Sequence, residues 1–439
     1  MTWLRLPLEI TYEIAHCNAH DRSTLCAMAL VSKTMRSIAI QFLFATIQFS
    51  WAEDVKLWIA MMRRMPELGI WIVKEVFFYS PNLGTAKGLP LKKRRKTGKN
   101  RHRAAVGVLD IPQMPSVRLV SFEGDSCRPC ATNSAKLVPY LSVFPSMTEL
   151  HISCMMFADI EDLATLLGAC EKLRSLTFIN FEVYSPAHDN DWNEKDQLSS
   201  SLFDLTAVEK LRVVCDDSAD FLLELMDHSR PDGLKSLTLG DAYTETPCSV
   251  NVAEKLFAMS AQSLEKIALG AIFGISSNAE YMHQKVFTEM LSAVPEFPAL
   301  TSLELWLTPT RDSEPTVRKF PAAPNVKVIT LSFLLEADDV DALNADVLDL
   351  FAVMKWSPSL PWKTLAKDLL HKKFPRFERL EFNICGNWLP CRYCLPEIRM
   401  PVEGSVRSAI ADVEDVLSFR WSDLDEKQVE YCIWCGLSM

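Results

Sequence analysis

The residues of this chain best suited to chemistry are its cysteines, of which there are 13. Two Cys-x-x-Cys pairs near the C-terminus, Cys391/Cys394 and Cys432/Cys435, offer four thiolates, the number that a tetrahedral Zn²⁺ site requires. The 37 residues between the pairs exceed the roughly 15–20 that are usual in such sites. Aromatic residues beside both pairs fit burial of the cysteines instead. Zinc binding is therefore a secondary hypothesis, and the sequence predicts no cofactor.

Motifs of the common enzyme classes are absent from the sequence. It contains no H-E-x-x-H, G-x-S-x-G, G-x-x-x-x-G-K-[ST] or G-x-G-x-x-G. Glycine is also scarce, with 14 residues, about half of the usual ~7% of a chain. We therefore expect no catalytic residues and a protein that is not an enzyme.

One strongly basic run interrupts an acidic chain. Residues 92–103 (KKRRKTGKNRHR) hold eight Lys or Arg and no acid, which leaves a formal charge of −18 on the rest of a chain whose net charge is −10. Such a body repels nucleic acid, and no aromatic residues interleave the basic ones for base stacking. The run is either a solvated loop or a nuclear import signal, whose core would be Lys92, Lys93, Arg94, Arg95 and Lys96.

The sequence carries no sign of secretion or of a membrane span. Its start, MTWLRLPLEI, lacks the basic and long apolar regions of a signal peptide. No uncharged apolar run approaches the ~18 residues that span a bilayer. We expect a cytoplasmic and/or nuclear protein with mostly reduced thiols and with neither membrane nor nucleic acid as partner.

Three short helical patterns fill the first tenth of the chain. In the first, Ile10 and Ile14 recur at helical spacing on one face. Asp21 and Ser23 can cap a second helix, and Ser32 can cap a third. Because a unit of ~45 residues has only a marginal core of its own, its apolar surface is expected to dock elsewhere. It docks either on the following domain, as a cap, or on a separate protein.

These residues resemble the F-box. The motif is carried by Leu6-Pro7-x-Glu9-Ile10-x-x-x-Ile14, then Leu25, then Leu30-Val31-Ser32-Lys33-x-x-Arg36-x-x-Ala39. The resemblance departs from the family at Met35, where an aromatic residue is frequent, and at Cys17, where Leu is common. In that family the three-helix unit binds a Skp-family adaptor, which links it to a cullin–RING ubiquitin ligase. The resemblance implies an adaptor interface made of Leu6, Pro7, Ile10, Leu30, Val31 and Lys33.

A second pattern, hydrophobic-x-x-hydrophobic-x-hydrophobic, recurs ten times in the rest of the chain. Three of the spacings are 26 residues, within the ~20–29 residue period of leucine-rich repeats. The copies are Val73/Val76/Phe78, Val117/Val120/Phe122, Met147/Leu150/Ile152, Leu173/Leu176/Phe178, Val208/Leu211/Val213, Leu234/Leu237/Leu239, Leu264/Ile267/Leu269, Leu300/Leu303/Leu305, Val326/Ile329/Leu331 and Phe377/Leu380/Phe382.

Helical patterns precede several of these copies, at residues 159–170, 220–229, 253–262 and 363–373, and a proline often stands just before the strand. Each copy therefore predicts one strand–helix unit. The copies resemble the irregular leucine-rich repeats of F-box proteins of a kind abundant in fungi. The predicted fold class is α/β: a three-helix F-box, then an irregular solenoid with parallel strands on the concave side and helices on the convex side. Ordinary βα units in a closed or doubly wound sheet are the alternative.

Polar residues between the apolar positions of each copy are expected to point away from the core. Those chosen as candidates for contact with a protein target are His151, Thr177, Arg212, Thr238, Glu304 and Arg379.

Together these observations predict an F-box over residues 4–49 and a repeat domain over 50–400, with a basic insertion near 84–104. Residues 401–439 are expected to form a C-terminal tail or cap. The predicted function is that of a substrate-recognition subunit of an SCF-type ubiquitin ligase, which binds a Skp-family adaptor, through it a cullin, and an unknown protein target. The alternative is a repeat scaffold without a ligase link, whose N-terminal helices cap the solenoid.

Overall fold

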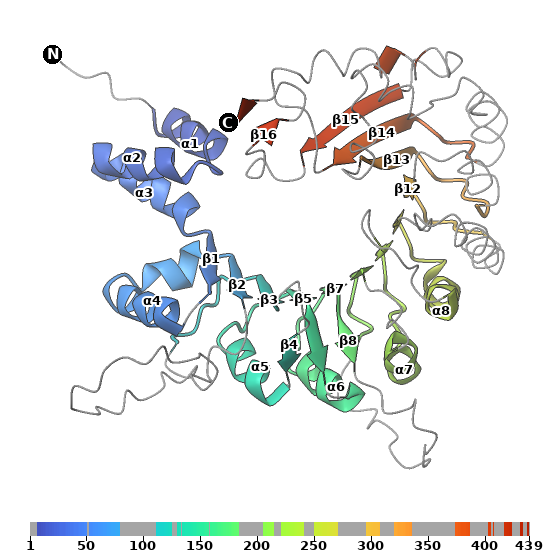
Figure 1. Cartoon of the computed structure of the whole chain (residues 1–439), viewed down its shortest axis with the longest axis horizontal. Helices are drawn as coiled ribbons and strands as arrows, with labels where there is room; N and C mark the ends of the chain where they lie inside the picture. Colours follow the sequence, from blue (N-terminus) through green and yellow to red (C-terminus); the bar gives the residue numbers. More distant parts are fainter. Residues whose placement is uncertain are drawn as a thin grey trace. The chain divides into compact units, whose positions relative to one another are not determined.

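The computed structural model describes residues 7–50, 52–79, 111–124, 130–132, 134–157, 159–183, 205–214, 221–240, 250–270, 296–307, 320–335, 374–386, 403–404, 407, 417–423, 431–432 and 437–438. The chain divides into two compact units, Met1–Ala207 and Val208–Met439. Helices and parallel strands make up both units, which confirms the predicted α/β class (Figure 1).

The first unit begins with three helices and continues directly into a sheet. Its elements up to the second strand are α1 (Leu8–Cys17), α2 (Arg22–Val31), α3 (Lys33–Leu43), β1 (Thr46–Phe49), α4 (Ala52–Arg64), the π-type turn η1 (Leu68–Ile72) and β2 (Glu75–Tyr79). Strand β1 pairs in parallel with β2. Only two residues connect α3 to β1, so the connection between the helices and this strand is short.

The sheet of the first unit grows in chain order. After β2 come β3 (Leu119–Glu123), β5 (Glu149–Ser153) and β7 (Ser175–Ile179), each parallel to the one before it. Helices α5 (Ser134–Leu141) and α6 (Ile160–Gly168) lie on one side of these strands (Figure 1). A second, smaller parallel sheet joins β4 (Cys130–Thr132), β6 (Met155–Phe157) and β8 (Glu182–Val183).

The core of this sheet is built from equivalent positions of successive strands. Val120, Leu150 and Leu176 are partners in register and are fully or almost fully buried. The aromatic rings of Phe49, Phe78 and Phe122 form a row, with centroids 5.3 and 5.4 Å apart. In-register stacking of like side chains lets each strand cover the apolar surface of its neighbour, as nearest-neighbour packing requires.

The second unit repeats the arrangement with seven parallel strands among its described residues. They are β9 (Lys210–Val214), β10 (Ser236–Leu239), β11 (Lys266–Leu269), β12 (Ser302–Leu307), β13 (Val328–Leu335), β14 (Arg379–Gly386) and β15 (Leu417–Asp423). Its described helices include α7 (Phe221–His228) and α8 (Val250–Ser260), and a short antiparallel pair joins β16 (Tyr431–Cys432) to β17 (Leu437–Ser438).

All ten copies of the apolar motif coincide with strands, so that part of the prediction is confirmed. The first residue of a copy closes a turn: the N–H groups of Met147 and Leu234 donate to the carbonyls of Phe144 and Pro231, at 3.0 and 3.2 Å. The turn residues include the five prolines that precede strands: Pro115, Pro145, Pro298, Pro324 and Pro375. Fixed φ at proline suits this sharp change of direction.

The helical patterns at residues 159–170, 220–229 and 253–262 are confirmed as α6, α7 and α8, whereas residues 363–373 lie outside the described part. Within each unit the strand order follows the chain without reversal, unlike a doubly wound sheet, in which the order reverses. Among the described helices, none has the length and apolar character needed to cross a membrane.

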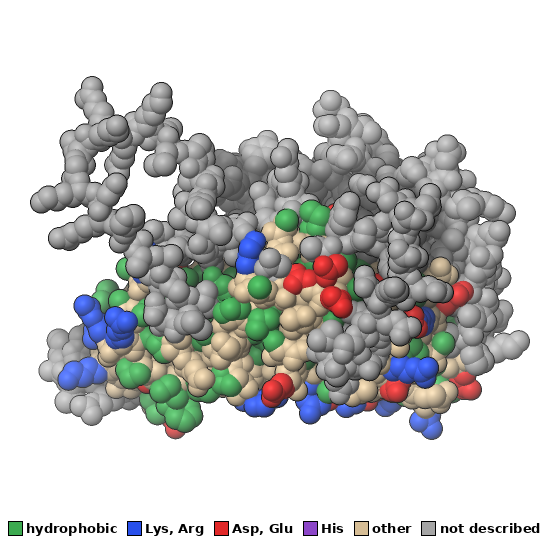
Figure 2. Space-filling view, turned by 90° about the horizontal axis from the view of Figure 1, so that it is seen from below, with side chains coloured by type: hydrophobic (Ala, Val, Ile, Leu, Met, Phe, Trp, Pro, Cys, Tyr) green, Lys and Arg blue, Asp and Glu red, His purple; other side chains and the backbone are tan. Residues whose placement is uncertain are grey.

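One face of the molecule is shown in Figure 2, seen from below the view of Figure 1. Where this face is described, hydrophobic, acidic and basic side chains lie in small separate groups. Neither sign of charge dominates it, so this view offers no extended electrostatic surface for a polyanion.

Candidate functional site

Side-chain caps begin the second and third of the N-terminal helices. The Asp21 carboxylate accepts hydrogen bonds from the backbone N–H groups of Ser23 and Thr24, at 2.9 and 3.1 Å, and so begins α2. Ser32 ends α2 and begins α3, because its hydroxyl accepts from the Met35 N–H at 3.1 Å. The caps predicted at Asp21 and Ser32 are therefore confirmed, whereas Ser23 lies inside α2 and is not its N-cap. Ser32 is shared by the end of α2 and the start of α3.

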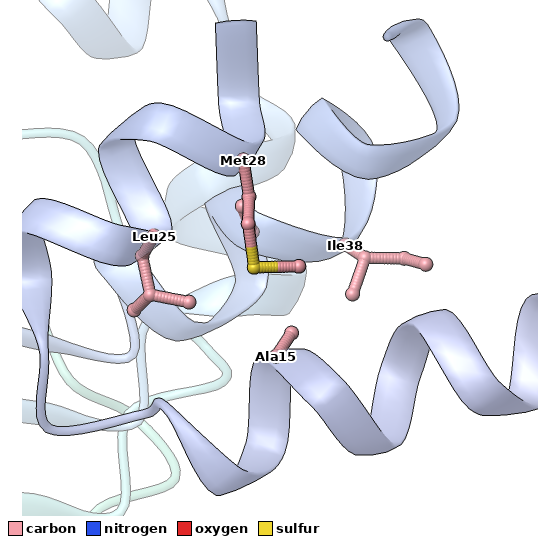
Figure 3. Packing of buried hydrophobic residues seen from close by; sticks show 5 residues of the cluster. Ala15, Leu25, Met28 and Ile38 are labelled. Carbon is pink, nitrogen blue, oxygen red and sulfur yellow. The ribbon is translucent and has the colours of Figure 1, made fainter. Parts of the chain in front are cut away.

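The three helices enclose a small core of their own. Ala15 of α1, Leu25 and Met28 of α2, and Ile38 and Ala39 of α3 are buried together. Figure 3 shows the Met28 side chain pointing toward Ala15, with Leu25 and Ile38 on either side. Because these residues come only from α1, α2 and α3, the unit does not depend on the sheet for this cluster.

Large aliphatic side chains remain on the outside of the same unit. Leu30 is 80% exposed, Val31 69% and Ile10 47%, and Leu8 and Ile14 are exposed as well. The helices bury Thr11 and Ala15 of α1 in their place. We name the five residues Leu8, Ile10, Ile14, Leu30 and Val31 the aliphatic surface. Ile10 and Ile14 lie one helical turn apart on α1, and Leu30 and Val31 are consecutive at the end of α2, so each pair exposes adjoining aliphatic side chains.

The structure places five of the six predicted adaptor residues. Pro7 precedes α1, Lys33 begins α3, and both are exposed together with Ile10, Leu30 and Val31. Leu6 lies outside the described residues. Leu8 was not among the predicted residues, although its position directly after Pro7 places it in the first turn of the helix.

The face of the first sheet that is turned away from the core carries the next candidates. His151 and Thr177 are partners in register on β5 and β7. His151 is half-buried, while Thr177 is 6% exposed. The expected outward alternation holds in β5 but fails in β7, where Ser175 and Thr177 are buried. Small polar side chains between larger neighbours are shielded at the ~4.8 Å spacing of strands.

A tyrosine and a carboxylate meet at the end of this face. Tyr79 and Glu123 are partners in register on β2 and β3, and the tyrosine hydroxyl donates to the carboxylate. Burial raises the pKa of Glu123, and the hydrogen bond opposes that rise. Burial, followed by the charge of Glu123, raises the pKa of Tyr79. The pair was missed by sequence reasoning; its signal is a polar residue directly after the last apolar position of two adjacent copies.

The remaining target candidates lie on the second sheet. Arg212 and Thr238 are partners in register on β9 and β10, and Arg212 is exposed while Thr238 is half-buried. Glu304 continues the same row on β12, two strands further along. Arg379 is exposed at the start of β14, in the neighbouring row. The structure therefore places Arg212 beside Thr238 but leaves Arg379 some distance from them.

Glu304 is held by a chain of hydrogen bonds. The Ser332 hydroxyl donates to its carboxylate at 2.9 Å, and the Asn383 amide donates to the Ser332 oxygen at 3.1 Å. Ser332 and Asn383 are buried. This network orients the carboxylate of Glu304, which makes it a fixed acceptor rather than a mobile surface charge.

The basic run and most of the paired cysteines fall outside the described residues. Lys92, Lys93, Arg94, Arg95 and Lys96 are all in this category, as are Cys391, Cys394 and Cys435. For Cys432 the structure gives only its place in β16. Within the described ranges, no group of three or more His, Cys, Asp or Glu side chains is arranged to hold a metal ion.

No protein-family model matches the chain, and no curated protein matches it either.

Proposed function

We propose that this chain is the substrate-recognition subunit of an SCF-type cullin–RING ubiquitin ligase and that it performs no catalysis itself. The aliphatic surface carries the proposal. A three-helix unit with a core of its own leaves Leu30 80% and Val31 69% exposed. In this proposal a Skp-family adaptor covers these side chains and links the chain to a cullin.

The energetics of such an interface are favourable. Fully burying one Val, Leu or Ile side chain contributes about 1.5–3 kcal/mol. Those side chains of the aliphatic surface that the adaptor covers would form part of the apolar core of the interface. The exposed Lys33 at the start of α3 would lie at its polar rim.

The repeat units would hold the target. Parallel strands that follow the chain order in each unit, with the motif in register from strand to strand, support an irregular leucine-rich-repeat solenoid. A target bound to the sheet face would be kept near the charged ubiquitin-conjugating enzyme of the ligase. The gain in rate would come from the higher effective concentration of the target lysine.

The test is capture of a purified Skp-family adaptor by the full-length chain. The double variant Leu30→Glu/Val31→Glu should lose capture, because two charges would be buried in the interface. The matched control is Leu57→Glu/Trp71→Glu, which changes two residues that are 70% and 72% exposed on α4 and η1. Circular dichroism should show both variants to be folded. Equal capture by the two variants, or no capture by the unchanged chain, would refute the proposal.

A second function is favoured by the short connection between the helices and the sheet. Only two residues separate α3 from β1, and the Ala45 carbonyl there accepts the N–H of Lys74 at 2.8 Å. The helices would then be a cap on an interaction scaffold without a ligase link. Under this alternative the unchanged chain would capture no adaptor, and a charge placed in the core of the helices would destabilise the sheet that they cap.

A further inference from the structure

Two lysines stand out on the exposed face of strands β9, β10 and β11. Leu211, Leu237 and Ile267 of these strands are buried. The residues before them alternate to the opposite face, where Lys210 and Lys266 are exposed.

Register places these lysines on either side of a hydroxyl. Lys210 pairs with Ser236, which pairs in turn with Lys266. At ~4.8 Å per strand, the Cα atoms of the two lysines are about 9.6 Å apart. In the next row, two residues or about 6.6 Å along the strands, Thr238 and Ala268 are half-buried. Small side chains therefore fill the middle of a surface with basic residues at its sides.

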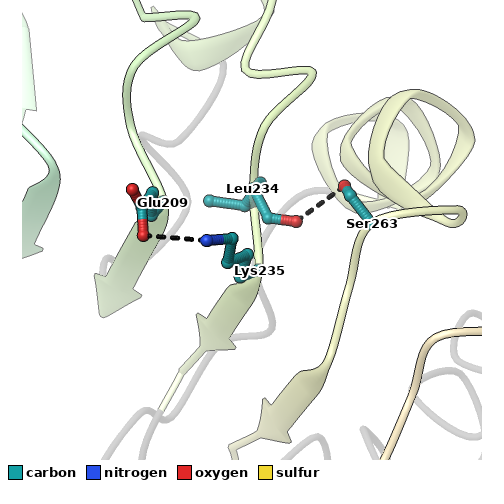
Figure 4. A network of polar contacts seen from close by, with 4 residues as sticks. All are labelled: Glu209, Leu234, Lys235 and Ser263. Carbon is teal, nitrogen blue, oxygen red and sulfur yellow. Dashed lines mark hydrogen bonds and ion pairs between the residues drawn. The ribbon is translucent and has the colours of Figure 1, made fainter.

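Glu304 borders this surface on β12, in register with Ala268, and its carboxylate already accepts the Ser332 hydroxyl at 2.9 Å. The acids next to the two lysines in sequence do not neutralise the surface. Glu209 forms an ion pair with Lys235 at 3.2 Å (Figure 4). Glu209 and Glu265 stand one position before the lysines of the surface, so they alternate toward the opposite side of the sheet. Among the described residues, neither Lys210 nor Lys266 has an ion-pair partner.

We propose that the face of β9–β11 binds an extended acidic segment of a partner polypeptide, through carboxylates at Lys210 and Lys266. This inference rests on the proposed function, because it names the chemical class of the target. Side chains on one side of an extended chain repeat every ~6.6 Å, so separate carboxylates can reach separate lysines. The Ser236 and Thr238 hydroxyls can donate to the same carboxylates, and the small residues leave room for the bound backbone.

The spacing favours carboxylates over a single phosphate. One phosphate group needs several donors converging on one point, whereas the two lysines start about 9.6 Å apart on side chains that act as flexible point charges.

The test uses the full-length chain and a fluorescein-labelled peptide of alternating Glu and Ser, followed by fluorescence anisotropy. Lys210→Gln/Lys266→Gln should raise the Kd roughly three- to tenfold, the effect of losing two exposed charge contacts. The control Lys235→Gln/Lys327→Gln removes the same charge from lysines paired with Glu209 and Glu378 and should leave the Kd almost unchanged. Added salt should weaken binding.

Three results would overturn the inference. The two double variants could raise the Kd equally, or the unchanged chain could bind an alternating Lys and Ser peptide with equal affinity. In the third, phosphorylation of the peptide serines would strengthen binding in a way that depends on Lys210 and Lys266. Adaptor capture by the same variants separates this inference from the proposed function. Peptide binding without adaptor capture would remove the ligase role and leave the acidic-segment site in place. Adaptor capture without peptide binding would remove the acidic-segment site and leave the ligase role in place.

Discussion

At the scale of single residues, the helical unit depends on the ionised side chain of Asp21. Its carboxylate accepts two backbone N–H groups and the hydroxyls of Ser23 and Thr24, at 2.7 and 2.5 Å. The Thr24 hydroxyl first, and then that of Ser23, lower the pKa of Asp21 from 3.8 to about 2. The folded state therefore prefers the charged form of this residue.

This preference predicts a pH-dependent loss of stability. The contribution of Asp21 is fully present above its unfolded pKa of 3.8 and is lost as the pH falls toward about 2. Asp21→Asn keeps a capping oxygen but has no charge, so its thermal midpoint should be lower than that of the unchanged chain at neutral pH. The difference should shrink in acid. A difference that stays constant over the whole pH range would contradict the assignment.

At the scale of elements, one repeated strand motif organises both units. Successive strands align the same positions of the motif, so Leu150 lies between Val120 and Leu176 on its two neighbours. Each buried motif residue thus packs against its counterparts. Removing one of these side chains therefore weakens the packing of the strands on both sides.

The motif predicts that substitutions at two adjacent residues of one strand change the free energy of unfolding by very different amounts. Leu150→Ala removes a fully buried side chain and should cost about 2–5 kcal/mol in the free energy of unfolding. Glu149→Ala, one residue earlier on the half-buried side, should change it by less than about 0.5 kcal/mol. Urea unfolding midpoints of both variants provide the measurement. Similar midpoints would mean that the core does not lie where the alternation places it.

Two strands of the sheets, β1 and β15, were not predicted from the motif. Phe44, Ile47 and Phe49 have the same spacing, and Ile47 and Phe49 pair with Val76 and Phe78 in β1 and β2. This copy is hidden because it overlaps the end of the F-box resemblance. Strand β15 is harder to find, since Glu414 stands at the first motif position, before Leu417 and Phe419. Pairing with the long strand β14 compensates there for the incomplete pattern.

At the scale of the whole molecule, the helical unit and the sheet have separate cores within the first unit. The cluster around Met28 draws only on α1, α2 and α3, whereas the rows through Phe78 and Phe122 belong to the strands. Separate cores can open separately, as local unfolding units do.

This separation predicts that a substitution in the helical core unfolds the helices and leaves the strands folded. Met28→Asp places a charge in the helical core, where Met28 is 8% exposed, and should unfold α1–α3. Hydrogen exchange should then accelerate in residues 8–43 and stay slow in the strands from β2 to β7. Adaptor capture should be lost at the same time. Faster exchange throughout the strands would instead support helices that cap the sheet.

Sequence alone determined helices α1–α3 and α6–α8, the caps at Asp21 and Ser32, ten strands and the α/β class, because these follow from local spacing and from short-range hydrogen bonds. The tertiary structure decided what local patterns do not contain: which apolar residues stay exposed and which strands pair. Ile10 and Leu25 are both aliphatic residues at helical spacing, yet only Leu25 is buried, because burial depends on which neighbours the fold supplies. Likewise, Lys210 and Lys266 became neighbours of one serine only through strand register, a long-range property that spacing along the chain does not encode.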